Sequence, residues 1–209
     1  MNPISETLRQ HYSEKFALHG ASSQGVDWGA NEANVLLRYQ KMLEVIKHPE
    51  GRPSLLDVGC GYGGLLSYAN DKKIELDYTG IDVAENMIEW ARANQAGGIF
   101  TVGDVVHHEF EGQFDYVVCN GILTQKLDTT NLAMDQFAAQ LIKRMFSLCK
   151  VGIVFNVMTT KVNYFSNNLY YRNPAELFSW CLSEISSHIR LDHSYPLFEY
   201  TLQIYREPI

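Results

Sequence analysis

Six consecutive residues, Gly59-Cys60-Gly61-Tyr62-Gly63-Gly64, have the composition of a turn that holds a cofactor. They follow Leu55-Leu56 and Asp57-Val58, and they lead into a second apolar pair, Leu65-Leu66. Glycine adopts positive φ and lets a ligand approach the backbone where a Cβ atom would clash. A helix that begins after such a turn offers unpaired N–H groups to the ligand. The segment therefore predicts a buried strand, a glycine turn and a helix that together form a cofactor site.

Two classes of cofactor fit this turn. Gly59, Gly61 and Gly64 satisfy G-x-G-x-x-G, and Asp82 follows about 20 residues later, as in the dinucleotide fingerprint of dehydrogenases. Asp57 lies at the end of the predicted buried strand, where a carboxylate is costly to bury, so we expect it to have polar partners there. With this upstream acid, the string D-V-G-C-G-x-G resembles motif I of the class I S-adenosylmethionine (SAM)-dependent methyltransferases. That string is more specific than three glycines.

Three further segments resemble the same family at the expected intervals. They are Tyr78–Val83 (YTGIDV), Phe100–Val105 (FTVGDV) and Phe114–Asn120 (FDYVVCN). In the family, the acid after the second strand binds both ribose hydroxyls of SAM, and the resemblance assigns this role to Asp82. The acid after the third strand binds the adenine amino group, which assigns that role to Asp104. On local pattern alone, both acids are also consistent with turn or cap residues.

The resemblance implies a set of cofactor-binding residues. The segment after the fourth strand is expected to contact the methionine part of SAM through its backbone, although a plain turn is the alternative. Arg38 is a candidate for the SAM carboxylate, because the guanidinium fork suits carboxylates, or else a solvated residue on a helix surface. The complete set is Trp28, Arg38, Asp57, Gly59, Cys60, Gly61, Asp82, Val83, Met87, Asp104, Val105, Asn120, Gly121 and Ile122.

Composition narrows the class of partner. The 209 residues suffice for one domain, predicted over residues 1–209, and the net charge of −7 disfavours nucleic acid. No apolar stretch approaches the ~20 residues that span a bilayer, and the polar start lacks the apolar core of a signal peptide. The four cysteines lie far apart without a Cys/His cluster, which predicts reduced thiols and no zinc. We expect a cytoplasmic protein, a monomer or homodimer, that acts on a small molecule.

Strand and helix patterns alternate from residue 54 onward, which predicts an α/β fold. The family implies a Rossmann-like seven-stranded sheet of order 3-2-1-4-5-7-6, with strand 7 antiparallel and helices on both faces. The predicted strands are Ser54–Val58, Tyr78–Asp82, Ile99–Gly103, Phe114–Cys119, Val151–Val157, Ile185–Asp192 and Leu197–Arg206. The predicted helices of this part are Gly64–Asn70, Ala84–Asn94, Asp135–Cys149 and Ala175–Leu182, the last capped by Asn173.

Residues 1–50 are predicted to form a helical lid on a SAM-binding core over residues 51–209. An amphipathic helix is expected over Val35–Ile46, ended by His48-Pro49. The preceding stretch, HGASSQGVDWG, is polar and rich in glycine, yet it contains Trp28, a side chain that favours burial. A flexible stretch with a buried aromatic residue is typical of a lid.

Four residues are candidates for contact with the methyl acceptor. His19 lies in the predicted lid and is the candidate general base, with a surface histidine as the alternative. Tyr12 lies ahead of it, and Tyr171 and Arg172 belong to an aromatic loop after the fifth strand, where packing is the alternative. We expect no metal, because the fourth-strand region lacks the paired carboxylates of metal-dependent catechol methyltransferases.

The implied reaction is methyl transfer from SAM to a small polar molecule, most consistent with an oxygen acceptor, with release of S-adenosylhomocysteine (SAH). Cys119–Ile122 lacks the two prolines of adenine and glutamine amino-methyltransferases. The strings GVDWG, RNPAELFSW and YPLFEYTLQIYR are similar to bacterial methyltransferases associated with surface glycans, which suggests a metabolite or glycan precursor. The alternatives are an RNA or protein methyltransferase and a non-catalytic SAM-binding accessory protein.

Overall fold

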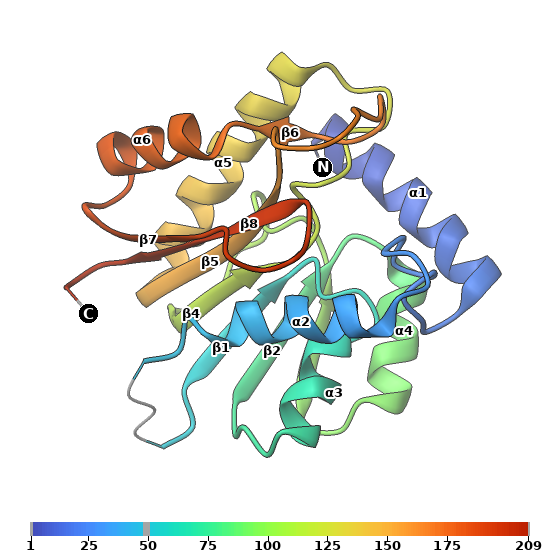
Figure 1. Ribbon diagram of the computed structural model, residues 1–209. Helices are drawn as coiled ribbons and strands as arrows, with labels where there is room; N and C mark the ends of the chain where they lie inside the picture. The colour runs from blue at the N-terminus through green and yellow to red at the C-terminus, as the bar shows by residue number, and fades with distance from the viewer. Residues whose placement is uncertain (1, 48–50, 209) are drawn as a thin grey trace.

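A computed structural model describes residues 2–47 and 51–208. Its elements pack around one sheet with the strand order β3-β2-β1-β4-β5-β8-β7, in which β6 also pairs with β5 (Figure 1). The predicted seven-strand order is thereby confirmed, and the two-residue β6 is an addition to it. The strands are β1 Ser54–Val58, β2 Asp77–Asp82, β3 Gly98–Val102, β4 Phe114–Cys119, β5 Cys149–Thr159, β6 Tyr171–Arg172, β7 His188–Asp192 and β8 Glu199–Tyr205.

Helices cover both faces of this sheet, as predicted. Buried side chains of α2, α3 and α4 pack on one face, and those of α5 and α6 pack on the other. Among the described helices, none combines the length and apolar character that crossing a bilayer requires. The helices are α1 Pro3–His19, α2 Glu32–Leu43, α3 Gly64–Asp71, α4 Glu85–Asn94, α5 Asn131–Leu148 and α6 Pro174–Glu184.

The parallel strands end together. Val58 at the end of β1 is paired with Ile81 of β2 and with Cys119 of β4, and Asp82 is paired with Val102 of β3. The side chains that follow these strands therefore meet at one edge of the sheet. β8 runs antiparallel to both of its neighbours, β5 and β7.

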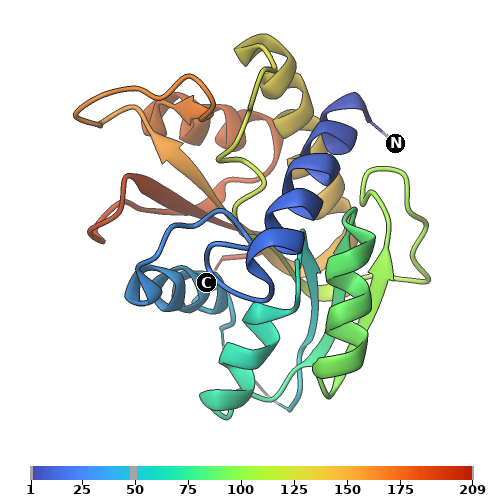
Figure 2. The same ribbon diagram turned by 90° about the vertical axis from the view of Figure 1, so that its right-hand side faces the viewer.

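Helix α1 lies across this edge, beside α4 (Figure 2). The Asn2 side chain caps it by accepting from the Ile4 N–H group, and Pro3 occupies its first turn, where a missing N–H costs nothing. Ile4 and Leu8 belong to the main core, so the front of the predicted lid is a packed helix. The helix also extends to His19, which we had placed in the glycine-rich loop.

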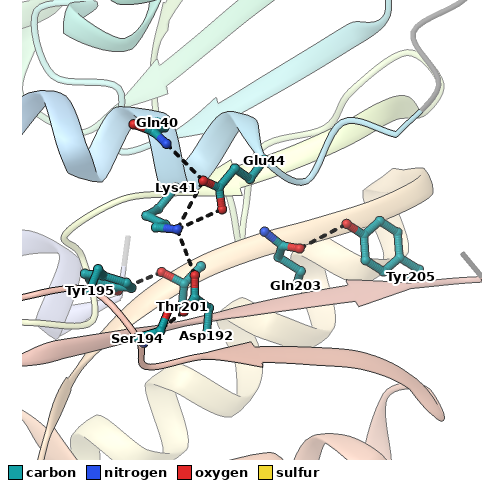
Figure 3. A network of polar contacts seen from close by, with 9 residues as sticks. All are labelled: Gln40, Lys41, Glu44, Asp192, Ser194, Tyr195, Thr201, Gln203 and Tyr205. Atoms are coloured by element: carbon teal, nitrogen blue, oxygen red, sulfur yellow. Dashed lines mark hydrogen bonds and ion pairs between the residues drawn. The ribbon is translucent and has the colours of Figure 1, made fainter.

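Helix α2 is joined to β7, at the edge of the sheet, by an ion pair of low exposure between Lys41 and Asp192 (Figure 3). Lys41 Nζ lies 2.9 Å from Asp192 Oδ2 and 3.0 Å from Glu44 Oε2. The lysine and the neighbouring Ser194 hold the pKa of Asp192 at about 2, below its usual range, even though burial alone would raise it. Helix α2 ends at Leu43, before the predicted Ile46, and His48 and Pro49 lie outside the described residues.

Candidate functional site

A hollow opens where β1, β2, β3 and β4 end, beneath α1 and the loop that follows it. It includes about 920 Å³ of empty space when the open mouth is counted. Open parallel sheets bind ligands at this edge. Most of the predicted site residues line it, namely Tyr12, Trp28, Asp57, Gly59, Cys60, Gly61, Asp82, Val83, Met87, Asp104, Val105, Asn120, Gly121 and Ile122.

The glycine turn forms the floor of this hollow. Gly59, Gly61 and Gly63 have φ of 74°, 54° and 81°, in the left-handed region that favours glycine. A Cβ atom on Gly59 would lie 2.6 Å from Ile122 Cδ1, so the turn and the segment after β4 approach each other closely. The turn leads directly into α3, whose first N–H groups have no partner within the helix.

Asp82 connects the turn to the end of β2. Its Oδ2 atom accepts from the Gly61 N–H group at 2.8 Å, and its Oδ1 atom accepts from the Ala84 N–H group at 2.8 Å. Burial raises the pKa of Asp82, and these backbone hydrogen bonds partly offset the effect. Each carboxylate oxygen keeps a lone pair for a further donor. This chemistry suits the two hydroxyls of a ribose ring.

Asp57 is the most strongly buried acid of the hollow. It is 3% exposed, and its Oδ2 atom accepts from the Tyr78 hydroxyl at 2.6 Å. Burial raises the pKa of Asp57 to about 7, with the Tyr78 hydrogen bond acting against the rise and the charge of Asp82 adding to it. This residue therefore exchanges a proton near neutral pH. It has the polar partner that its position in the sequence required.

Asp104 connects the end of β3 to α1. Its Oδ2 atom accepts from the Asn2 N–H group at 3.1 Å, and its Oδ1 atom accepts from the Val106 N–H group at 3.1 Å. The start of α1 is thus hydrogen-bonded to Asp104.

The Asn120 side-chain amide indicates that a ligand fits the hollow. The residue is 8% exposed, yet neither side-chain polar atom has a hydrogen-bond partner. Buried polar groups are rarely left unpaired, so a partner from a bound molecule accounts for this one. Next to it, the Gly121 N–H group donates to Asn156 Oδ1 at 2.8 Å, and a Cβ atom on Gly121 would lie 3.0 Å from Trp28 Nε1. The indole therefore packs directly on the segment after β4.

Four predicted site residues do not line this hollow. Arg38 donates through Nε to both carboxylate oxygens of Glu199, at 3.0 and 3.1 Å, and its guanidinium lies 5.3 Å from the Trp28 ring centroid. It supports the tryptophan, and its free Nη1 atom is buried without a partner. Arg38 therefore contacts β8 and Trp28, and its assignment to the SAM carboxylate stays a prediction.

The other three lie farther from the strand ends. His19 is exposed at the last residue of α1 and does not line the hollow, and its assignment as general base stays a prediction. Arg172 Nη1 lies 3.1 Å from Asp135 Oδ2, which compensates its charge. Tyr171 lines a separate hollow, and its hydroxyl accepts from the Ser166 N–H group at 3.1 Å.

A polar cluster around Asp27 was missed by sequence reasoning. Asp27 Oδ2 lies 3.0 Å from His11 Nε2 and accepts from Gln125 Nε2 at 3.0 Å, while Oδ1 lies 3.0 Å from Lys15 Nζ. Gln125 Oε1 accepts in turn from Asn168 Nδ2 at 3.1 Å. This cluster joins α1, its following loop, the segment after β4 and the loop before β6. The contributing residues are distant in sequence and match no motif.

The residues that cover the hollow leave little free space inside it. The hollow offers about 90 Å³ to the centres of water molecules, because Leu8, Tyr12, Val26 and Trp28 cover it. Entry of a molecule as large as a nucleoside derivative therefore requires α1 or the loop after it to move. Among the described residues, no group of three or more His, Cys, Asp or Glu side chains is placed to hold a metal ion.

Comparison with known proteins agrees with this geometry. Residues 55–150 match the family described as a methyltransferase domain. A Mycobacterium tuberculosis protein named "Putative methyltransferase" is 29% identical over 153 residues, which cover 72% of this chain and 92% of that protein.

Solved structures extend the likeness to the whole fold. Magnesium protoporphyrin IX methyltransferase from Synechocystis PCC 6803, with bound SAH, superposes with a TM-score of 0.67 at 15% identity, covering 98% of this chain and all of that one. The cyclase SpnF superposes with a TM-score of 0.69 at 13% identity, covering 99% and 98% of the two chains. At this identity the likeness establishes the fold alone. The matched domain, the motif residues at the strand ends and the sheet order together support a class I SAM-dependent methyltransferase.

Proposed function

We propose that the chain transfers a methyl group from SAM to an oxygen atom of a small polar molecule and releases SAH. The observation that carries the proposal is the Asn120 side chain, which lies unpaired beside the motif carboxylates in a nearly closed hollow. The bound cofactor supplies a methyl group that the positive charge on sulfur already activates. The protein has to hold it, align the acceptor and exclude water.

Each residue at the strand ends is assigned to a different part of SAM. Asp82 would accept hydrogen bonds from the ribose hydroxyls and Asp104 would accept one from the adenine amino group, as the family resemblance implies. Ionised Asp57 favours the positively charged end of the cofactor, and the Asn120 amide gains the partner that it lacks. The glycine turn lets the backbone approach the cofactor closely.

Helix α1 and the loop after it close the site over both ligands. Tyr12, Val26 and Trp28 form the apolar part of this cover. The Asp27 cluster fixes the cover to the segment after β4 through Gln125. This cover favours a small acceptor, because an RNA or a folded protein would have to insert an extruded base or a single side chain beneath it.

Neither histidine of α1 lines the hollow, and we favour His11 over His19 as the group that removes the proton of the acceptor hydroxyl because His11 contacts Tyr12, which does line it. Its Nε2 atom is paired with Asp27, which leaves Nδ1 able to accept a proton, and a carboxylate stabilises the imidazolium that forms. His11 also contacts Tyr12 edge to face, with 5.1 Å between ring centroids, and Tyr12 lines the hollow. Burial and the nearby charges of Asp27 and Asp82 raise the pKa of Tyr12, so its hydroxyl acts as a donor and not as a base.

Transfer of tritiated methyl from SAM tests the proposal and its rivals together. Purified protein is incubated in parallel with a low-molecular-weight cell extract, total RNA and an undenatured protein fraction. We expect label in the small molecules, in products that resist acid as methyl ethers do. Label in RNA or protein alone would favour an RNA or protein methyltransferase. SAM binding without transfer to any fraction would favour the accessory protein.

A further inference from the structure

A second hollow lies next to the candidate cofactor site, on the other side of the segment that follows β4. It offers about 520 Å³ to the centres of water molecules and is much more open than the first. It lies between this segment, the start of α5 and the loop that joins β5 to β6. The lining residues are Lys126, Asn131, Thr160, Phe165, Ser166, Asn167, Leu169 and Tyr171.

The two hollows share one wall. Residues 120–122 line the first hollow and Lys126 lines the second, so Lys126 lies four positions along the chain from residue 122. This distance cannot exceed about 14 Å even in extended chain. The wall is fixed to the β5–β6 loop, because the Lys126 and Leu127 N–H groups donate to Asn168 O and the Tyr170 N–H group donates to Thr124 O. The two hollows therefore lie on either side of one short, fixed segment.

Two aromatic rings form one side of the second hollow. Phe165 and Tyr171 meet edge to face, with 4.9 Å between ring centroids. Phe165 is nevertheless 63% exposed, so packing within the chain does not account for it. An exposed ring beside a hollow offers an apolar face for a flat ligand surface.

The rest of the lining consists of four neutral polar residues, one apolar residue, Leu169, and one cation. Asn131, Thr160, Ser166 and Asn167 offer amides and hydroxyls, and no acid lines the hollow. Lys126 Nζ donates only to backbone carbonyls at 3.3 and 3.4 Å, and within the described residues it pairs with no carboxylate. Its charge is thus available to a ligand, whereas Arg172 nearby is paired with Asp135.

We propose that this second hollow binds a sugar ring bearing an acidic group, as the part of the methyl acceptor that stays outside the reaction. A pyranose ring has an apolar face for Phe165 and hydroxyls for the amides and hydroxyls of the lining, and its acidic group pairs with Lys126. The proposal rests on the proposed function, because it places the acceptor across the shared wall. It adds the chemical class of the acceptor.

Two simple glycosides test the proposal without knowledge of the natural acceptor. Methyl β-D-glucuronide and methyl β-D-glucoside are titrated into the protein and followed by saturation-transfer NMR. We expect both to bind at about millimolar concentration, the glucuronide more tightly. Phe165→Ala should weaken both at least about fivefold, and Lys126→Gln should reduce the glucuronide to the affinity of the glucoside.

Tyr164→Ala is the matched control, because Tyr164 is the neighbouring exposed aromatic residue and does not line the hollow. It should leave both glycosides unaffected. SAH affinity is measured on the same proteins, and none of the three substitutions should change it. No binding of either glycoside, equal binding of the two, or indifference to Phe165→Ala would overturn the sugar site. Failure of SAH to bind the wild type would instead overturn the proposed function.

Discussion

Asp57 should make the binding of SAM release a proton. Burial holds the pKa of this carboxyl at about 7, and the residue lines the cofactor hollow beside the glycine turn. SAM carries positive charge on its sulfonium and its ammonium group. A cation nearby favours the ionised carboxylate and lowers its pKa. The bound state therefore holds fewer protons than the free state.

The size of the effect follows from this pKa. At about pH 6 the free protein carries about 0.9 proton on Asp57, and at about pH 8 it carries about 0.1. Binding should therefore release close to one proton at the lower pH and almost none at the higher. Affinity for SAM should rise by up to about tenfold per pH unit below the pKa and level off above it. SAH, which lacks the sulfonium charge, should show a smaller release.

Calorimetry in buffers of different ionisation enthalpy measures this release directly. Asp57→Asn should abolish it at both pH values, since an amide does not titrate. Asp77→Asn is the matched control, because Asp77 is exposed at the opposite end of the neighbouring strand and pairs with Arg52. Wild-type binding heats that are equal in all buffers at about pH 6 would refute the reasoning.

Three further predictions concern the cover and the fold. Asp27→Asn keeps a residue type that tolerates the φ of 56° but removes the charge, so residues 11–30 should exchange amide hydrogens faster and SAH should dissociate several-fold faster by stopped flow. Gly121→Ala should lower both the melting temperature and SAH affinity, because its Cβ meets the Trp28 indole at a φ of 98°; unchanged values would contradict the close packing. The free protein should lose stability in urea as pH rises from about 4 through about 7, since the folded state holds the Asp57 proton more tightly than the unfolded chain does, and Asp57→Asn should remove that slope.

The central part of the fold could be predicted because its signals are local. The run from Leu55 to Gly64 specifies a strand, a turn and a helix within a few residues, and an acid follows each of the next two strands. Once the family is recognised, parallel pairing brings those acids to one edge. The sheet order and the lining of the cofactor hollow follow from that placement.

The cover could not be predicted in the same way, because tertiary contacts decide it. Whether His11 or His19 faces a carboxylate depends on the length of α1 and on how the loop after it folds back, and neither leaves a motif. Arg38 has the chemistry of a SAM ligand. Because α2 lies over β8, however, its guanidinium pairs with Glu199, a residue far away in sequence. Side chains that gather from distant segments require the structure.

SAH binding to Asp82→Asn tests the central claim most directly. The substitution keeps the size of the side chain and one acceptor for the turn, and it removes the charge that two ribose hydroxyls would meet. Charge-assisted hydrogen bonds contribute about 1.5–3 kcal/mol each, so calorimetry should show at least about tenfold weaker binding than in wild type and in Asp77→Asn. The melting temperature should stay within a few degrees of wild type. Unchanged affinity in a folded Asp82→Asn protein would contradict the assignment of this hollow as the SAM site.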